Sequence, residues 1–298
     1  MDKSARAKAL AAATAGHVFW GFSFIASRRA LDTAHVFVLL SHRFVLALAV
    51  MSLAMPIFGA KLRLKGRRAW LLVLLGLLEP VVYFFGEQYG ILHSSTIFSG
   101  VMIAMIPVAA TLAALPVLHE KPTAAQIVFS LLSVAGVIGI GLITKSSGSL
   151  DLIGVIALVV AVLAAVGYTL LSRGLAKEYS PFDRTYMMLA VGAVVFTAFA
   201  MGVTRGNAAE YFAPFSDGYY CLSVGFLGVC CSVVSYFLAS YAITNLTVAQ
   251  TTVFANLTTA VSVFAGAVLL KEPFSWLGVL FCLLILIGIY GVQRAAKE

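Results

Sequence analysis

Three charged side chains stand inside otherwise apolar stretches of this sequence: Arg43, Glu79 and Glu87. A charge in apolar surroundings is costly unless it is paired or neutralised, so each of the three needs a role. Glu79 and Glu87 are eight residues apart with Tyr83 midway, and this spacing puts all three on one face of a helix. One interpretation is that Arg43 pairs with one glutamate and holds two helices together. The other carboxyl group would then be free to move a proton.

Glu79 is the stronger candidate for that proton, because Pro80 follows it in the middle of its apolar stretch. Proline has no N–H, so it leaves the carbonyl of Gly76 unbonded and predicts a kink. We expect Glu79 to keep its proton at neutral pH and to release it when water enters. Glu87 lies nearer the end of the stretch, where water or Arg43 can satisfy it. In the alternative, Glu79 is permanently ionised, pairs with Arg43 and serves structure alone.

Polar and aromatic side chains near the middle of other apolar stretches form a second set. His17 and Trp20 are three residues apart, and Trp20 lies far from either end of its stretch. A buried histidine, or a serine or asparagine on a helix face, most often only joins helices by hydrogen bonds. We expect instead that those nearest the middle line a pocket for a small molecule. The residues expected to line it are His17, Trp20, Glu79, Tyr83, Ser99, Met102, Tyr236 and Asn256.

The composition predicts an integral membrane protein. The 298 residues are 61% hydrophobic and 11% charged, and the mean hydropathy is +1.01, whereas soluble domains are about 25% charged. The net charge of +8 lies beside apolar stretches and does not indicate nucleic-acid binding. The four cysteines fit no zinc site, and no phosphate-binding loop is present, so we expect no metal, no cofactor and no ATP-driven activity.

Ten stretches are long enough to span a bilayer, which requires about 20 mainly apolar residues. Their continuous apolar runs predict helices rather than the alternating strands of a barrel. The bilayer itself is therefore one expected partner, and the oligomeric state is left open, with a monomer as one option. The predicted spans are 9–27, 35–58, 69–91, 95–117, 123–143, 152–172, 184–203, 218–242, 247–269 and 275–293.

The distribution of Lys and Arg predicts the orientation, because cytoplasmic loops carry an excess of both. With a cytoplasmic N-terminus, fourteen of the 20 Lys and Arg residues lie in the inner segments and five in the outer loops, and Arg43 lies inside a span. We therefore expect both termini in the cytoplasm.

The second half of the sequence repeats the first at a distance of 152 residues. The shift aligns Gly76 with Gly228 and Glu120 with Glu272, and a proline closely follows each of these glutamates. A carboxylate and a proline both suit the first turn of the helix that follows. Each half, 1–147 and 148–298, holds five spans, and an odd number inverts the second half in the membrane. The predicted fold is an all-α integral membrane protein of ten transmembrane helices in two inverted five-helix repeats, an architecture typical of alternating-access transporters.

An intramembrane enzyme is the competing class. Ser99–Gly100 lacks the preceding glycine of rhomboid-type proteases, and no aspartate lies within a predicted span, so a paired-aspartate protease is excluded. A sensor without transport activity is the other alternative.

Several local patterns accompany the ten spans: Trp20–Gly21 with Ser23, Arg43–Phe44, Pro107, Glu120 with Gln126 and Gly136, and Glu272–Pro273 with Gly278 and Gly288. Together they resemble the drug/metabolite transporter superfamily, and within it the EamA-type members. Thr259 departs from the pattern, because the second half often carries a proline there. The resemblance implies export or exchange of small metabolites in a bacterial inner membrane, with aromatic and neutral amino-acid exporters as the most similar members, and drugs or other metabolites as the alternative cargo.

Overall fold

The computed structural model describes residues 3–57, 61–63, 66, 68–93, 102–143, 151–269 and 276–295. Regular structure in this part of the chain is helical. Nine helices of the described residues are long and apolar enough to cross a membrane, and the shorter Met102–Leu118 adds a tenth apolar helix. The predicted all-helical membrane fold is confirmed, and each described span overlaps its predicted place; the first part of the predicted span 95–117 lies outside the described residues.

Two of the spans are interrupted by π-helical segments, η1 and η3, and a short helical excursion, α10 with η2, connects two others. The elements in chain order are α1 (Lys3–Leu31), α2 (Val36–Ile57), α3 (Trp70–Gly76), η1 (Leu77–Val82), α4 (Tyr83–Leu92), α6 (Ile106–Leu118), α7 (Ala124–Ile143), α8 (Leu152–Leu175), α9 (Pro181–Val203), α10 (Ala208–Phe212), η2 (Ala213–Ser216), α11 (Gly218–Phe226), η3 (Leu227–Val234), α12 (Ser235–Asn245), α13 (Val248–Thr252), α14 (Ala255–Leu269) and α15 (Trp276–Arg294).

Polar side chains satisfy the free backbone N–H groups at several helix starts. At the start of α7, Thr123 and Gln126 exchange side chain–backbone hydrogen bonds of 2.9 and 3.1 Å in the manner of a capping box. Glu120, which the sequence placed at this helix start, instead accepts a hydrogen bond from the backbone N–H of Val248 at the start of α13. That expectation is therefore wrong about which helix the carboxylate caps, because the chain folds the loop before α7 onto the other half.

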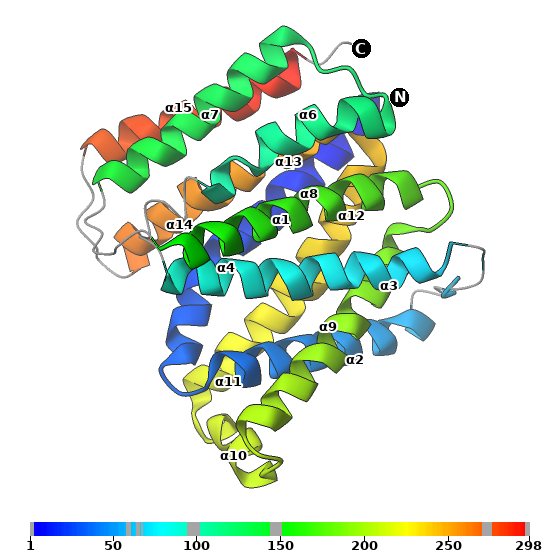
Figure 1. The fold of residues 1–298 in the computed structure, drawn as a ribbon, viewed down its shortest axis with the longest axis vertical. Coiled ribbons are helices and arrows are strands. Elements are labelled where there is room, and N and C mark those ends of the chain that lie inside the picture. The colour runs from blue at the N-terminus through cyan, green and yellow to red at the C-terminus, as the bar shows by residue number, and fades with distance from the viewer. Residues whose placement is uncertain are drawn as a thin grey trace.

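Helices α7 and α15 lie side by side (Figure 1) and approach closely at glycines. A Cβ atom on Gly136 of α7 would lie 2.7 Å from the carbonyl oxygen of Phe281 on α15. A Cβ atom on Gly288 of α15 would likewise lie 2.7 Å from the carbonyl oxygen of Phe129 on α7. Each residue in one contact is 152 positions from its counterpart in the other, so the repeat seen in the sequence is also a repeat of packing.

Elsewhere in the bundle, too, helices of the first half pack on helices of the second. Helix α2 packs on α9, α8 packs on α4 and α6, and α1 packs on α12 and α14. The segment η1 also falls on the last part of η3 when it is shifted by 152 residues. The two halves therefore interlock, as expected for repeats. The predicted boundary between residues 147 and 148 lies outside the described residues and stays a prediction.

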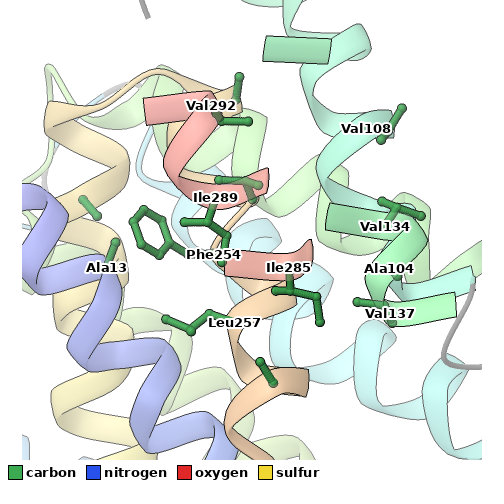
Figure 2. Packing of buried hydrophobic residues seen from close by; sticks show 14 of the residues in the cluster. Ala13, Ala104, Val108, Val134, Val137, Phe254, Leu257, Ile285, Ile289 and Val292 are labelled. Carbon is green, nitrogen blue, oxygen red and sulfur yellow. The ribbon is translucent and has the colours of Figure 1, made fainter. Parts of the chain in front are cut away.

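The largest buried hydrophobic cluster joins helices of both halves. Figure 2 shows Ala13 of α1, Val134 of α7, Leu257 of α14 and Ile285 of α15 in this cluster. A second cluster packs α2 against α9 and contains Tyr236 of α12, with Trp20 of α1 packed against it. The second cluster thus brings two predicted site residues from opposite halves together.

Candidate functional site

The third span is broken at Glu79, as the Glu79–Pro80 sequence predicted. Glu79 has extended backbone angles, φ −141° and ψ 122°, between the helical segments α3 and α4. The hydroxyl of Tyr236, on α12 of the second half, donates a hydrogen bond to Oε1 of Glu79 at 3.4 Å. A carboxyl group at the break in one half therefore contacts a side chain of the other half.

Trp20 connects the first helix to the same place. Its Nε1 donates to the carbonyl oxygen of Cys231 in η3 at 2.8 Å. Its ring lies edge-on to that of Tyr236, with centroids 5.1 Å apart and an angle of 67°. A tryptophan in an apolar span usually needs a partner for its N–H, and a π-helical segment leaves carbonyl groups in a different register. We call Trp20, Glu79 and Tyr236 the central cluster, because contacts join all three.

Arg43 lies beside this cluster and is almost fully buried, with 6% of its surface exposed. Its Nε donates to Oγ of Ser232 in η3 at 2.7 Å. The guanidinium carbon lies 5.5 Å from the ring centroid of Phe44 and 5.7 Å from that of Phe84, within the range of cation–π attraction. Its two terminal nitrogens donate no hydrogen bond within the described part of the chain.

The expected ion pair between Arg43 and a glutamate is not formed in this conformation. Among the residues that the structure describes, the ion pairs within 4.0 Å do not include Arg43. Each glutamate is instead bonded by a tyrosine: Glu79 by Tyr236, and Glu87 by Tyr83 at 3.0 Å. The contact between Tyr83 and Glu87 matches the predicted helix face.

His17 contacts the central cluster through its ring. The ring centroid lies 4.9 Å from that of Trp20 at an angle of 88°, and 6.0 Å from that of Phe254. Its Nδ1 donates to the carbonyl oxygen of Ala13, one turn earlier in the same helix, at 2.8 Å. One ring nitrogen of His17 is therefore used within its own helix.

The remaining residues predicted to line the pocket are Ser99, Met102 and Asn256, and none of them takes part in the contacts described above. Asn256 is buried and donates from Nδ2 to Oγ of Ser133 on α7 at 3.1 Å, which is the interhelical bond that was its alternative role. Met102 is partly buried at the start of the Met102–Leu118 helix. Ser99 lies outside the described residues. A cavity of about 110 Å³ lies not at the central cluster but beside Glu120 and Thr247.

Two further buried residues bear on the site and were not singled out by the sequence. Tyr168 of α8 is 5% exposed and lies in the same buried cluster as Tyr236. Arg184, counted as a loop cation in the sequence, is fully buried in α9. The only signal for either was its polar type within or next to an apolar span.

Comparison with known proteins identifies relatives along nearly the whole chain. The EamA-like transporter family matches residues 7–142 and again residues 152–294. The chain is 32% identical over 276 residues to the uncharacterized transporter YcxC of Bacillus subtilis (strain 168), covering 91% of this chain and 88% of that protein. It is 24% identical over 276 residues to an uncharacterized transporter of Archaeoglobus fulgidus, covering 93% and 95% of the two chains.

A crystal structure of another protein has the same fold. It superposes with a TM-score of 0.82 at 17% sequence identity, covering 99% of this chain and 100% of the other. At that identity the likeness concerns the fold alone. The two separate matches of one family, to 7–142 and to 152–294, agree with the two repeats.

Proposed function

We propose that this chain, which belongs to the EamA-like transporter family, is a secondary transporter that carries small organic metabolites by alternating access. Membership of the family makes the chain a membrane transporter and not an enzyme. Its relatives are transporters of a bacterium and an archaeon. The substrate, the coupling and the site are the parts that we propose.

The observation that carries the site is the contact of the two halves at a break in a helix. The central cluster lies where Glu79 interrupts the third span and where η3 offers a carbonyl group to Trp20. Discontinuous helices at the interface of two repeats are where secondary transporters bind substrate and ion, because irregular backbone is tolerated in the membrane only beside protein or a cavity. The cluster is packed in this conformation, and we propose that it opens when the halves move apart.

The chemistry of the cluster supports aromatic or neutral amino acids as substrates. Trp20, Tyr83 and Tyr236 supply aromatic surface for an apolar side chain. The terminal nitrogens of Arg43 suit a carboxylate, and the carboxylate of Glu79 suits an ammonium group. Drugs or other metabolites are the second candidate, because the same aromatic surface would accept any flat apolar molecule.

We propose that Glu79 couples proton movement to substrate movement. Its hydrogen-bond partner is a neutral tyrosine and not an arginine, so ionisation of Glu79 would leave a charge without an ionic partner in the described part of the chain. A carboxyl group of this kind can exchange a proton when the site opens to water. The charge bias of the loops supports cytoplasmic termini and, with the bacterial relative, a bacterial inner membrane as the location.

The test is counterflow in proteoliposomes. Vesicles loaded with one unlabelled amino acid of a panel at a time are diluted into the same labelled compound, and its transient accumulation is followed. We expect accumulation of one or more aromatic or neutral amino acids, and its loss in Trp20→Ala, since the variant removes a ring and an interhelical hydrogen bond. Trp276→Ala is the matched control, because Trp276 is 86% exposed. Equal transport by both variants would place the site elsewhere, and no counterflow for any panel member would reject amino acids as the substrate class.

A further inference from the structure

Glu120 joins the two halves of the bundle at a second place, separate from the central cluster. It lies between α6 and α7, and its Oε1 forms an ion pair with Nε of Arg173 on α8 at 2.9 Å. Its Oε2 accepts a hydrogen bond from the backbone N–H of Val248 at 2.8 Å. Val248 is the first residue of α13, so the carboxylate lies at the positive end of a helix of the other half.

Arg173 also binds the end of α12, the helix that precedes α13. One terminal nitrogen donates to the carbonyl oxygens of Ile243 and Thr244, at 2.9 and 2.6 Å, in the last turn of α12. A cation is favourable there, because the last carbonyl groups of a helix lack partners and carry partial negative charge. The ion pair thus bridges the end of α12 and the start of α13, with each charge at the helix end that suits it.

Arg184 reinforces this arrangement from within. It is 0% exposed on α9, and one terminal nitrogen donates to both the carbonyl and the hydroxyl of Ser172 on α8. The other donates to the carbonyl of Ser240 and the hydroxyl of Thr244, both on α12. Two arginines therefore hold α8, α9 and α12 together beside the ion pair.

This network lies at the end of the bundle that carries both chain termini. Figure 1 shows the two termini together at one end of the helices. At the same end, Arg6 donates to the carbonyl of Gln293, and the hydroxyl of Thr123 donates to that of Ala295. The cavity of about 110 Å³ is lined by Glu120 and Thr247, directly beside the ion pair.

We propose that the ion pair between Glu120 and Arg173 is the gate that closes the path between the two halves at the end carrying the termini. The inference rests on the proposed alternating access. In this conformation the gate is closed: the loop of the first half is bonded to α8 and α13 of the second. Opening toward the termini separates Glu120 from both Arg173 and the N–H of Val248.

Partial burial makes this pair suited to holding a closed state. The side chains of Arg173 and Glu120 are 25% and 20% exposed. Those of Arg68 and Glu178, paired at the same distance of 2.9 Å, are 59% and 43% exposed. Exposed pairs contribute little because water screens them, whereas hydrogen bonds between charged groups strengthen as water is excluded. The exposed pair is therefore a matched control.

The test measures access to a cysteine behind the gate. Ala110→Cys, on α6 at a position that is 0% exposed and shares a buried cluster with Val166 of α8 and Val248 of α13, is placed in a chain whose four native cysteines are replaced by serine. Labelling by a membrane-impermeant maleimide is measured in sealed vesicles of both orientations. We expect Glu120→Gln to raise the labelling rate from the side of the termini by about tenfold or more, because a hydrogen-bonded charge pair is lost. Glu178→Gln should leave the rate unchanged.

Three further variants keep the outcome decisive. Arg173→Gln should also raise the rate, and the double variant with Glu120→Gln should raise it by less than the product of the two single increases, because both single variants remove the same ion pair. Glu120→Asp keeps the charge with a shorter side chain and should give a smaller increase; it serves if Glu120→Gln does not fold. An unchanged rate in Glu120→Gln, or an equal rise in Glu178→Gln, would overturn the gate. Labelling needs no substrate, so a wild-type protein that fails to transport would reject the proposed function and not the gate.

Discussion

Alanine at Gly136 or at Gly288 should destabilise the protein by similar amounts, because at both glycines the backbones of α7 and α15 approach closely. A Cβ atom at either position would lie 2.7 Å from a backbone carbonyl oxygen of the facing helix. A Cβ atom and a carbonyl oxygen do not approach this closely in folded proteins, and a backbone carbonyl cannot rotate away as a side chain can. The two helices would have to separate to admit the methyl group.

The magnitude follows from two opposing effects. Forcing an extra methyl group into a packed core loses about 1–3 kcal/mol of the free energy of unfolding. The better helix propensity of alanine returns up to about 1 kcal/mol. We expect a net loss of about 1–2 kcal/mol at each position. Gly202 is the matched control, because a Cβ atom there would meet nothing within 4 Å. Gly202→Ala should be neutral or slightly stabilising.

Unfolding by sodium dodecyl sulfate in mixed micelles, followed by tryptophan fluorescence, measures these differences. Gly136→Ala and Gly288→Ala should shift the midpoint equally toward lower denaturant, while Gly202→Ala leaves it in place. If Gly136→Ala unfolds at the midpoint of Gly202→Ala, the close approach of the helices is wrong. If the two glycine variants differ clearly from each other, the packing of the two repeats is not equivalent.

The remaining predictions concern the buried arginine and the orientation. Arg184→Met should lower the free energy of unfolding by about 1–3 kcal/mol, because buried acceptors lose their donor. The same titration measures the change, and Arg205→Met, in a turn, should be neutral. Equal stability of the two variants would show that the hydrogen bonds of Arg184 do not stabilise the fold. Glu210→Cys, in the short helix α10 between α9 and α11, should react with an impermeant reagent added outside intact cells, whereas Lys65→Cys should not. Labelling at position 65 would reverse the proposed topology.

The sequence was sufficient to predict the spans, the repeat and the helix break. Hydropathy decides which segments lie in the membrane, since a span requires a long apolar run. Pro80 predicted the break at Glu79, because proline removes a backbone donor in any surroundings. Trp20 was predicted to line a pocket, which stays a prediction; in the structure its N–H bonds the carbonyl of Cys231.

The partners of the polar groups could not be predicted in the same way. Arg43 bonds Ser232 and not a glutamate, because the choice depends on the rotation of α2 about its axis. An almost wholly apolar helix gives no periodic pattern from which that rotation can be inferred. The sequence relates Glu120 only to the helix that follows it, whereas its partners lie on α8 and α13, more than fifty residues away. Composition likewise does not decide whether Asn256 lines a pocket or bonds Ser133, as it does in the structure.

Proton-driven accumulation by Glu79→Gln tests the central claim most directly. Glutamine keeps the shape of the side chain and accepts the hydrogen bond from Tyr236, but it cannot exchange a proton. Proteoliposomes are measured with a labelled substrate identified by counterflow, with and without a pH gradient. We predict that the wild-type protein accumulates substrate against its gradient only when the pH gradient is present, and that Glu79→Gln retains counterflow but loses this accumulation. Accumulation by Glu79→Gln with an unchanged dependence on the pH gradient would contradict the proposed role of Glu79.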